Sequence, residues 1–309
     1  MTIVFSHPGC LGHNMGEGHP ERPARMDAVE QALQREGFDG SLVRRDAERA
    51  ALDCIGLMHP QKYIDKIVAS VPSSGITRLD ADTCLSPGSL EAALRAVGAA
   101  CSAVDAVVLG ESKNAFCAVR PPGHHAETNR AMGFCIFNTV AIAAAYARRR
   151  HGVERVAVID FDVHHGNGTQ EMFWSDQNLF FASTHQMPLY PGTGSKSERG
   201  EFENIVNCPL SAGDGSSAFR TAILDVILPG LETFKPDLLL VSAGFDAHMN
   251  DPLAGLNLQD SDYAWVTKQL LEVADKFTNG RLISTLEGGY DLLALTSSVA
   301  SHVEELLQA

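Results

Sequence analysis

One short segment of the chain carries three potential metal ligands at alternate positions. Asp160, Asp162 and His164 directly follow the apolar run 156–159. If the backbone stays extended there, the three side chains point to the same side of it. Catalytic zinc sites usually combine three protein ligands with one open position for water. We therefore expect Asp162, His164 and Asp246 to bind zinc. Asp160 is then left to orient a histidine from behind the ligands.

Two alternatives remain open for this segment. Any single aspartate in a loop can instead cap a helix or form a turn. Two carboxylates and one imidazole also suit Fe(II) or Co(II). The residue types thus indicate a metal site without identifying the metal.

Two adjacent histidines, His124 and His125, could transfer the protons of a hydrolysis. Metal-assisted amide hydrolysis needs a base for the water and an acid for the leaving amine, and histidine can be either near neutral pH. Asp160 and Asn167 could each accept one ring N–H. Because an aspartate favours the charged imidazolium and an asparagine does not, His124 is expected to be the more cationic and His125 the base. As an isolated dipeptide, such a pair is more often structural.

Tyr290 follows two glycines, and its phenol could donate a hydrogen bond to an oxyanion on the substrate carbonyl. Taken alone, a tyrosine in this context is more often packed into a turn. Its place after an apolar strand, like that of the other candidate residues, favours the catalytic role.

The surrounding chain predicts alternating strands and helices. Expected strands are 3–5, 115–119, 156–159, 179–182, 238–242 and 282–285, and expected helices are 23–36, 89–109, 139–150, 217–234, 262–277 and 292–307. Continuously apolar strands that alternate with helices indicate a mostly parallel sheet covered on both faces. No linker or repeat divides the chain, so a single α/β domain over residues 1–309 is expected.

Four of these strands end in glycine-containing loops with ionisable side chains. The loops begin after residues 119, 159, 242 and 285 and contain the candidate residues named above. In an open parallel sheet, ligands bind at the carboxyl ends of the strands. The four loops are therefore expected to converge on one site.

The composition of the chain limits the classes of binding partner and the cellular compartment that we expect for the protein. The formal net charge of −14 argues against nucleic-acid binding, which needs a basic face. Seven scattered cysteines without a C-x-x-C motif favour a reducing compartment over disulfides, so a cytoplasmic location is expected. We expect neither a signal peptide nor a membrane span, since no long apolar run occurs. The oligomeric state is not indicated.

The motifs together resemble the histone deacetylase and acetylpolyamine amidohydrolase superfamily, on its class II side. The resemblance covers nearly the whole chain and rests on residues 18–23, 120–125, 133–135, 160–168, 191–194, 242–246 and 287–290. It implies the arginase/deacetylase fold and a zinc-dependent hydrolysis of an acetyl-amide. Asparagine at position 167 is the class II pattern, where some members have a second aspartate.

The family's residue roles match positions of this chain one by one. Asp162, His164 and Asp246 match its zinc ligands, His124 and His125 its catalytic pair, Tyr290 its carbonyl-polarising tyrosine, and Asp160 the aspartate behind the first histidine. Phe134, with its neighbour Gly133, and Tyr190 match the walls of an acyl-lysine tunnel. Arg25 matches an arginine of the internal product channel, and Asp82 the aspartate of the tunnel rim.

The resemblance also implies two potassium ions. The first would bind Asp160 and the backbone of Asp162 and His164, together with Ser183 and Thr184. The second would bind backbone around Phe173, Asp176 and Leu179. Carbonyl ligands have no side-chain signature, so no residue pattern indicates either ion.

Leu253 bears on the substrate. The polyamine-selective deacetylase of eukaryotes has a glutamate at the aligned position, which selects a cationic substrate, and leucine cannot make that contact. We therefore expect an acylated lysine peptide or a small acetylated amine, with acetylpolyamine as the alternative; Glu17 could supply a compensating carboxylate but is more often a solvated loop residue. An arginase-like binuclear manganese enzyme and a non-catalytic acyl-lysine or partner-binding domain are two further alternatives.

Overall fold

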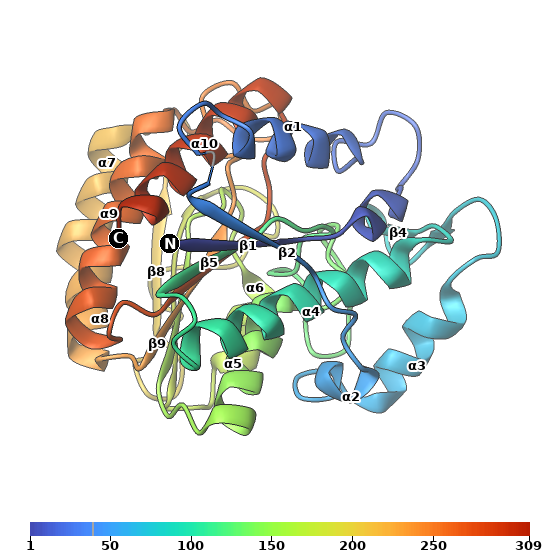
Figure 1. The fold of residues 1–309 in the computed structure, drawn as a ribbon, viewed down its shortest axis with the longest axis horizontal. Coiled ribbons are helices and arrows are strands. Elements are labelled where there is room, and N and C mark those ends of the chain that lie inside the picture. Colours follow the sequence, from blue (N-terminus) through green and yellow to red (C-terminus); the bar gives the residue numbers. More distant parts are fainter. Residues whose placement is uncertain (39) are drawn as a thin grey trace.

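An eight-stranded parallel β-sheet forms the centre of the structure, a computed structural model that describes residues 1–38 and 40–309 (Figure 1). The strand order is β2-β1-β5-β10-β9-β6-β7-β8, and each neighbouring pair is parallel. The strands are β1 (Thr2–Ser6), β2 (Leu42–Asp46), β5 (Asn114–Cys117), β6 (Val156–Asp160), β7 (Leu179–Gln186), β8 (Ile205–Leu210), β9 (Leu238–Ala243) and β10 (Leu282–Leu286). A separate antiparallel pair consists of β3 (Thr77–Arg78) and β4 (Cys84–Leu85).

Helices cover both faces of the sheet (Figure 1). One face packs against α1 (Ala24–Leu33), α7 (Ser216–Ala222), the π-helical segment η2 (Ile223–Ile227), α8 (Leu228–Phe234), α9 (Asp260–Phe277) and α10 (Leu292–Gln308). The other face packs against α4 (Ser89–Val108), α5 (Thr139–His151) and α6 (Asn167–Phe173). The 3-10 helix η1 (Pro8–Gly12) contacts α4, and α2 (Leu52–Ile55) and α3 (Gln61–Ser70) share a smaller core with α4 and α5.

Strand β6 shows why the central strands are apolar at every position. Ala157 and Ile159 face the core on one side of the sheet, whereas Val156 and Val158 face the core on the other. A strand with both faces buried has no solvent-facing positions, so the alternation of polar and apolar residues disappears. Polar side chains begin only where the strand ends, at Asp160.

The predicted α/β fold with a mostly parallel sheet and helices on both faces is confirmed. All six predicted strands are present, but the two edge strands, β2 and β8, were not predicted. Residues of β2 are half-buried or exposed and include Arg44 and Arg45, and β8 contains Pro209. An edge strand is not covered like a central one, and it tolerates charges and proline, which hide the apolar signal. The helix predicted at 217–234 is divided into α7, η2 and α8.

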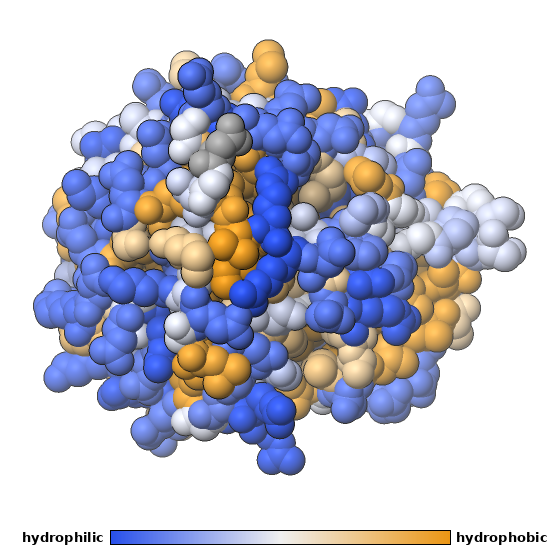
Figure 2. All heavy atoms as spheres, viewed as in Figure 1, coloured by the Kyte–Doolittle hydropathy of each residue, from blue (hydrophilic) through white to orange (hydrophobic). Residues whose placement is uncertain are grey.

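The molecular surface is mostly hydrophilic on the face shown in Figure 2, where apolar residues form small separate groups. The 38 acidic residues outnumber the 24 lysines and arginines. Within the part of the chain that the structure describes, no helix is long and apolar enough to cross a membrane.

The helix α4 approaches another backbone segment closely at Gly98. A Cβ at this position would overlap the carbonyl oxygen of Glu48 and lie 2.9 Å from the backbone nitrogen of Ala50. We predict that Gly98→Ala lowers the free energy of unfolding by about 1–3 kcal/mol, because overpacking must displace backbone. Urea denaturation measures this change. Gly12→Ala is the control, since its Cβ would lie 3.4 Å from the nearest atom, and equal losses for both variants would contradict the prediction.

Candidate active site

The sheet order brings the four predicted loops together. Strands β5, β10, β9 and β6 are consecutive neighbours in the sheet, although they lie far apart along the chain. Because they are parallel, their carboxyl ends share one edge, and the loops that follow them meet there. The expected convergence of these loops is observed.

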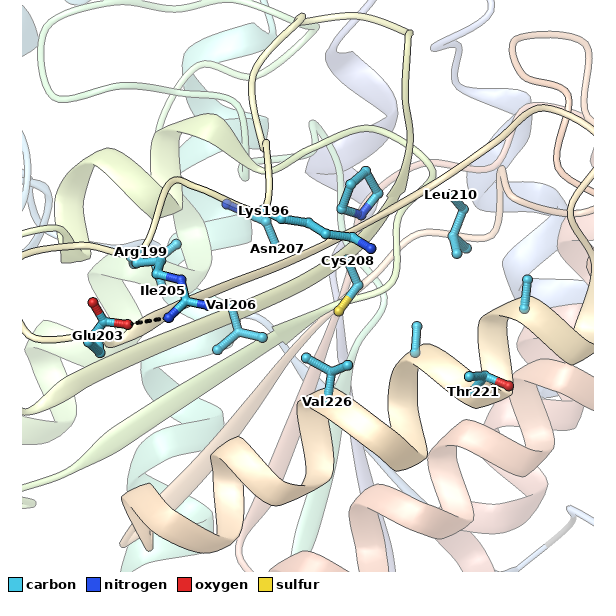
Figure 3. Close-up of a pocket in the computed structure, with 13 residues that line it drawn as sticks. Lys196, Arg199, Glu203, Ile205, Val206, Asn207, Cys208, Leu210, Thr221 and Val226 are labelled. Carbon is cyan, nitrogen blue, oxygen red and sulfur yellow. Dashed lines mark hydrogen bonds and ion pairs between the residues drawn. The ribbon is translucent and has the colours of Figure 1, made fainter.

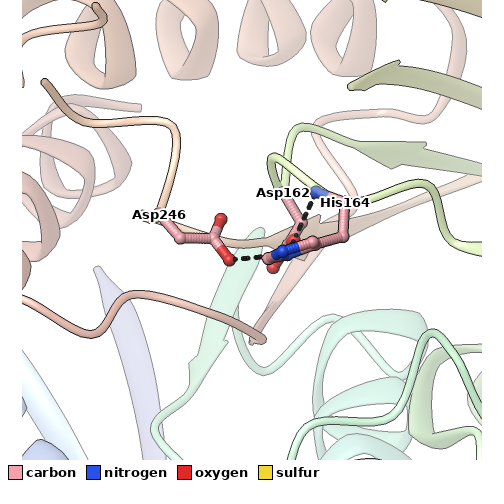
Figure 4. A group of neighbouring side chains, drawn as sticks. All are labelled: Asp162, His164 and Asp246. Atoms are coloured by element: carbon pink, nitrogen blue, oxygen red, sulfur yellow. Dashed lines mark hydrogen bonds and ion pairs between the residues drawn. The ribbon is translucent and has the colours of Figure 1, made fainter. Parts of the chain in front are cut away.

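Asp162, His164 and Asp246 form one compact cluster (Figure 4). One ligand atom from each lies within 4.8 Å of the other two. The His164 Nδ1 atom is 3.1 Å from Asp162 Oδ1 and 3.2 Å from Asp246 Oδ2. Backbone N–H groups hold the other carboxylate oxygens: Gly288 donates to Asp162 Oδ2 at 2.8 Å, and Val163 donates to Asp246 Oδ1 at 2.9 Å.

The donor set of this cluster fits a divalent cation. The two carboxylates are 0–1% exposed, so their charges require compensation inside the protein. Burial raises the pKa of Asp246, and the charge of Asp162 raises it further. Burial also lowers the pKa of His164, but hydrogen bonds to the two carboxylates outweigh this effect and raise it to about 10. The cluster therefore has a strong affinity for positive charge, and two oxygens with one imidazole nitrogen are suitable ligands for zinc.

Two loop glycines let the backbone wrap around these carboxylates. A Cβ on Gly244 would overlap the side chain of Asp162, and one on Gly288 would overlap both Asp246 and Asp162. The glycines of the strand-end loops are therefore needed for close approach of the backbone to the site.

The two adjacent histidines have different partners, as the sequence predicted. The His124 Nδ1 atom lies 2.8 Å from Asp160 Oδ2, and the His125 Nδ1 atom lies 2.8 Å from Asn167 Oδ1. Burial lowers the pKa of both rings. For His124 the charges of Asp160 and Asp162 outweigh burial and raise the pKa. For His125 the neighbouring histidines His124 and His164 add to burial, so its pKa falls well below the usual value.

A pocket of about 230 Å³ leads to these groups. His125, His164 and Tyr290 line it, as does Leu189. Five of the predicted substrate-binding residues also line it: Asp82, Gly133, Phe134, Tyr190 and Leu253. The ring of Tyr190 is 5.2 Å from that of His125, and the ring of Phe134 is 5.8 Å from that of Tyr290. The side chain of Asp82 accepts the backbone N–H of Gly133 at 3.2 Å, which ties the rim to the wall.

Arg25 lies behind the pocket and supports the tyrosine loop. Its guanidinium is fully buried and donates to the backbone oxygen of Gly289 at 2.7 Å. Its charge also lies 5.0 Å from the centre of the Tyr290 ring. Burial raises the pKa of Tyr290, so the phenol keeps its proton and can donate a hydrogen bond.

Two acidic residues to which sequence reasoning assigned no role also hold the site together. The buried carboxylate of Glu287 accepts the backbone N–H groups of Gly123 and His124 at 2.6 and 3.2 Å, and burial raises its pKa to about 7. Asp251 accepts the backbone N–H of Tyr290 at 2.7 Å and that of Leu253 at 3.0 Å. Glu287 belongs to the motif segment 287–290 and Asp251 precedes Leu253 by two residues, but neither position indicated this role, because a carboxylate that binds backbone has no characteristic spacing.

Among the predicted potassium ligands, Asp160 on β6 is the register partner of Ser183 on β7, and Thr184 follows it. Ser183 Oγ is 2.9 Å from Nδ1 of His185. At the second predicted site, the backbone oxygens of Phe173, Asp176 and Leu179 converge. They do so around Nδ2 of Asn204, at 2.8, 3.2 and 2.8 Å. These three carbonyls accept from the side-chain amide of Asn204 in this structure.

A larger groove lies elsewhere, between β8 and the helical segments α7 and η2 (Figure 3). Its volume is about 520 Å³, and its charged lining residues are Lys196, Arg199 and Glu203. Arg199 pairs with Glu203 at 2.7 Å, and most of the remaining lining is aliphatic. None of the predicted catalytic or ligand residues lines this groove, so size alone does not locate the chemistry.

Comparison with known proteins agrees with the geometry. The sequence pattern of the histone deacetylase domain matches residues 19–306. The chain belongs to the histone deacetylase family. It is 40% identical to the chloroplastic histone deacetylase 10 of Oryza sativa subsp. japonica, over 96% of this chain and 71% of that protein. It is 38% identical to the histone deacetylase-like amidohydrolase of Pseudomonas aeruginosa, over 94% of this chain and 77% of that protein.

A solved structure shows the same fold. The HD domain of HDA15 superposes with a TM-score of 0.94 at 33% sequence identity, over 99% of this chain and 88% of that one. The family confirms the predicted resemblance and makes this chain a deacetylase-like hydrolase. Metal use is general in the family, and the cluster of Asp162, His164 and Asp246 could hold such an ion.

Removal of the metal should destabilise the protein. We predict that the chelator-treated protein gains stability on addition of Zn²⁺, by about 2.7 kcal/mol at a free ion concentration one hundred times Kd. Thermal unfolding with and without Zn²⁺ measures the gain. Asp246→Asn should lose most of it. The control Asp237→Asn should keep it, because Asp237 pairs with Arg155 at the surface. A full Zn²⁺ response in the Asp246 variant would exclude this ligand.

Proposed function

We propose that this histone deacetylase family member is a zinc-dependent deacylase that hydrolyses an acetyl-amide to acetate and a free amine. The single observation that carries the proposal is the meeting of three groups at one pocket: the cluster around His164, the base candidate His125 and the phenol of Tyr290. Residues 1–309 act as one catalytic domain in this proposal. The seven free cysteines support a reducing, cytoplasmic setting, although the rice relative is named as chloroplastic.

The proposed zinc ion, held by Asp162, His164 and Asp246, would act as a Lewis acid and lower the pKa of a water molecule. His125 removes the proton of the attacking water, and its lowered pKa means that the ring starts neutral and can accept this proton. Tyr290 donates to the oxyanion that develops on the substrate carbonyl. His124 is paired with Asp160 and starts cationic. Either His124 or His125 then gives a proton to the departing amine.

A first potassium ion belongs to the proposal as well. Asp160, Ser183 and Thr184, with the backbone of Asp162 and His164, would hold it next to the zinc ligands. Its charge would offset part of the buried negative charge of β6. The second ion would be held by the backbone oxygens of Phe173, Asp176 and Leu179, which already face one point.

The substrate in this proposal is an acylated lysine peptide or a small acetylated amine. Phe134 and Tyr190 offer apolar walls for an aliphatic chain, and Asp82 at the rim can accept a backbone N–H. Leu253 lines the same pocket and provides no charge for a polyamine nitrogen. Acetylpolyamine hydrolysis is the alternative, and the assay with both substrate types decides between them.

Replacing Tyr290 by Phe tests the mechanism. We predict that Tyr290→Phe lowers kcat by about 10²–10³, because one oxyanion donor is lost, and leaves the metal content unchanged. Turnover of an acetyl-lysine peptide with metal-quantified protein measures the effect. Tyr263→Phe is the control, since its hydroxyl is also buried but the residue does not line the pocket. Near-normal turnover of the Tyr290 variant would contradict the proposed role.

Replacing Leu253 by Glu tests the substrate assignment. We predict that Leu253→Glu raises the ratio of kcat/KM for acetylspermidine over acetyl-lysine peptide by roughly tenfold, because a carboxylate attracts the extra ammonium group. Leu253→Gln, which is uncharged and of equal length, should leave the ratio nearly unchanged. If the unmodified protein already prefers acetylspermidine or acetylputrescine, the acyl-lysine assignment is wrong.

A further inference from the structure

The carboxamide of Asn167 can adopt two orientations that differ in which atom faces His125. A carboxylate at this position would present an oxygen in either orientation. The oxygen and the nitrogen of the carboxamide are similar in size, and rotation by half a turn exchanges an acceptor for a donor. Only the orientation with the oxygen toward His125 makes Nδ1 of that ring the donor. The opposite orientation would place the proton on Nε2, which the base needs to have free.

The carboxylate of Glu127 fixes the orientation of the Asn167 carboxamide. Asn167 Oδ1 lies 2.8 Å from His125 Nδ1, and Asn167 Nδ2 donates to Oε1 of Glu127 at 2.7 Å. The amide nitrogen also lies 3.4 Å from Sδ of Met132, a weak acceptor. If the amide turned over, its oxygen would face the Glu127 carboxylate, and two acceptors would repel each other.

The backbone of Glu127 does not depend on this hydrogen bond. Glu127 and Arg130 close a tight turn through two backbone hydrogen bonds, of 2.9 and 3.3 Å. The N–H of Thr128 in this turn donates to Oε2 of Glu171 on α6 at 2.9 Å. The turn that carries Glu127 is therefore fixed by hydrogen bonds that do not involve the Glu127 side chain. This side chain can then accept the hydrogen bond from the Asn167 amide.

We propose that Glu127 is a positioning residue that fixes the Asn167 carboxamide and thereby the tautomer of His125. The inference rests on the proposed function and deepens it, since it explains how an asparagine can orient the base. The hydrogen-bonded chain of Glu127, Asn167 and His125 keeps the proton of the ring on Nδ1. Nε2 then stays unprotonated and can accept a proton from the water. An aspartate at position 167 needs no such partner, because both of its oxygens accept.

Four variants test this dependence. Glu127→Ala should lower kcat by about tenfold to a hundredfold, the usual range for groups that orient a metal ligand or its histidine, with KM nearly unchanged. Glu127→Gln should restore kcat to within a few-fold, because Oε1 can still accept from Asn167. In an Asn167→Asp background, Glu127→Ala should leave kcat unchanged within about twofold or raise it, since the lost partner is then a repelling charge.

The control variant is Glu171→Ala. It removes the carboxylate that binds the backbone of the turn, but that carboxylate makes no hydrogen bond to the side chain of Asn167, so kcat should stay close to that of the unmodified protein. An equal loss in the Glu171 and Glu127 variants would show that only the turn matters. An equal factor for Glu127→Ala in both backgrounds, or a Gln variant as impaired as the Ala variant, would also overturn the proposal.

A spectroscopic readout separates this inference from the proposed function. Nitrogen-15 NMR of the zinc-loaded protein should show the His125 proton on Nδ1 in the unmodified chain and a shift toward Nε2–H in Glu127→Ala. The measurement needs no turnover. Inactivity on every acylated substrate would refute the proposed deacylase while the tautomer still tests the role of Glu127, and an unchanged tautomer in the variant would refute that role alone.

Discussion

The structure depends above all on the compensation of carboxylates that are removed from water. Asp160, Asp162, Asp246 and Glu287 are each at most 1% exposed and share one end of the sheet. A buried charge without partners is costly, so each of these groups must be matched by donors or cations. Glu287 binds two backbone N–H groups, and Asp160 binds His124. At the remaining pair, Asp162 and Asp246, a bound cation would compensate the most buried negative charge.

The same constraint explains the form of the loops. Backbone N–H groups can reach the carboxylates only where the chain comes close, and glycine permits this at Gly244 and Gly288. Parallel strands bring the loops to one edge, and the order β5-β10-β9-β6 makes them direct neighbours. The sheet therefore fixes where these loops begin, and the charged groups lie within a few residues of the strand ends.

The two histidines acquire different properties from this frame although they are adjacent in sequence. An acidic partner keeps one ring cationic, and an amide partner leaves the other ring neutral. The amide is in turn oriented by Glu127 in the proposed hydrogen-bonded chain. Charge differences at the reaction centre thus arise from side chains one contact away from the pocket.

The sequence by itself determined the sheet's central strands and the residue types of the site. Strands buried on both faces must be apolar throughout, and the polar groups that follow them are visible as sharp changes in composition. The spacing of Asp160, Asp162 and His164 and the motif resemblance indicated the family, which the comparisons confirmed. The roles of single residues remain predictions, supported by their convergence in the structure.

Only the tertiary structure decided what lies between the motifs. The edge strands β2 and β8 lack the uniform apolar pattern, so their place in the sheet depends on pairing with β1 and β7. Glu287, Asp251 and Glu127 are ordinary acidic residues in the sequence, because the backbone groups and amide that they bind come from distant segments. Contacts of this kind depend on three-dimensional proximity, which local composition does not encode, and they orient the residues whose chemistry the sequence had already indicated.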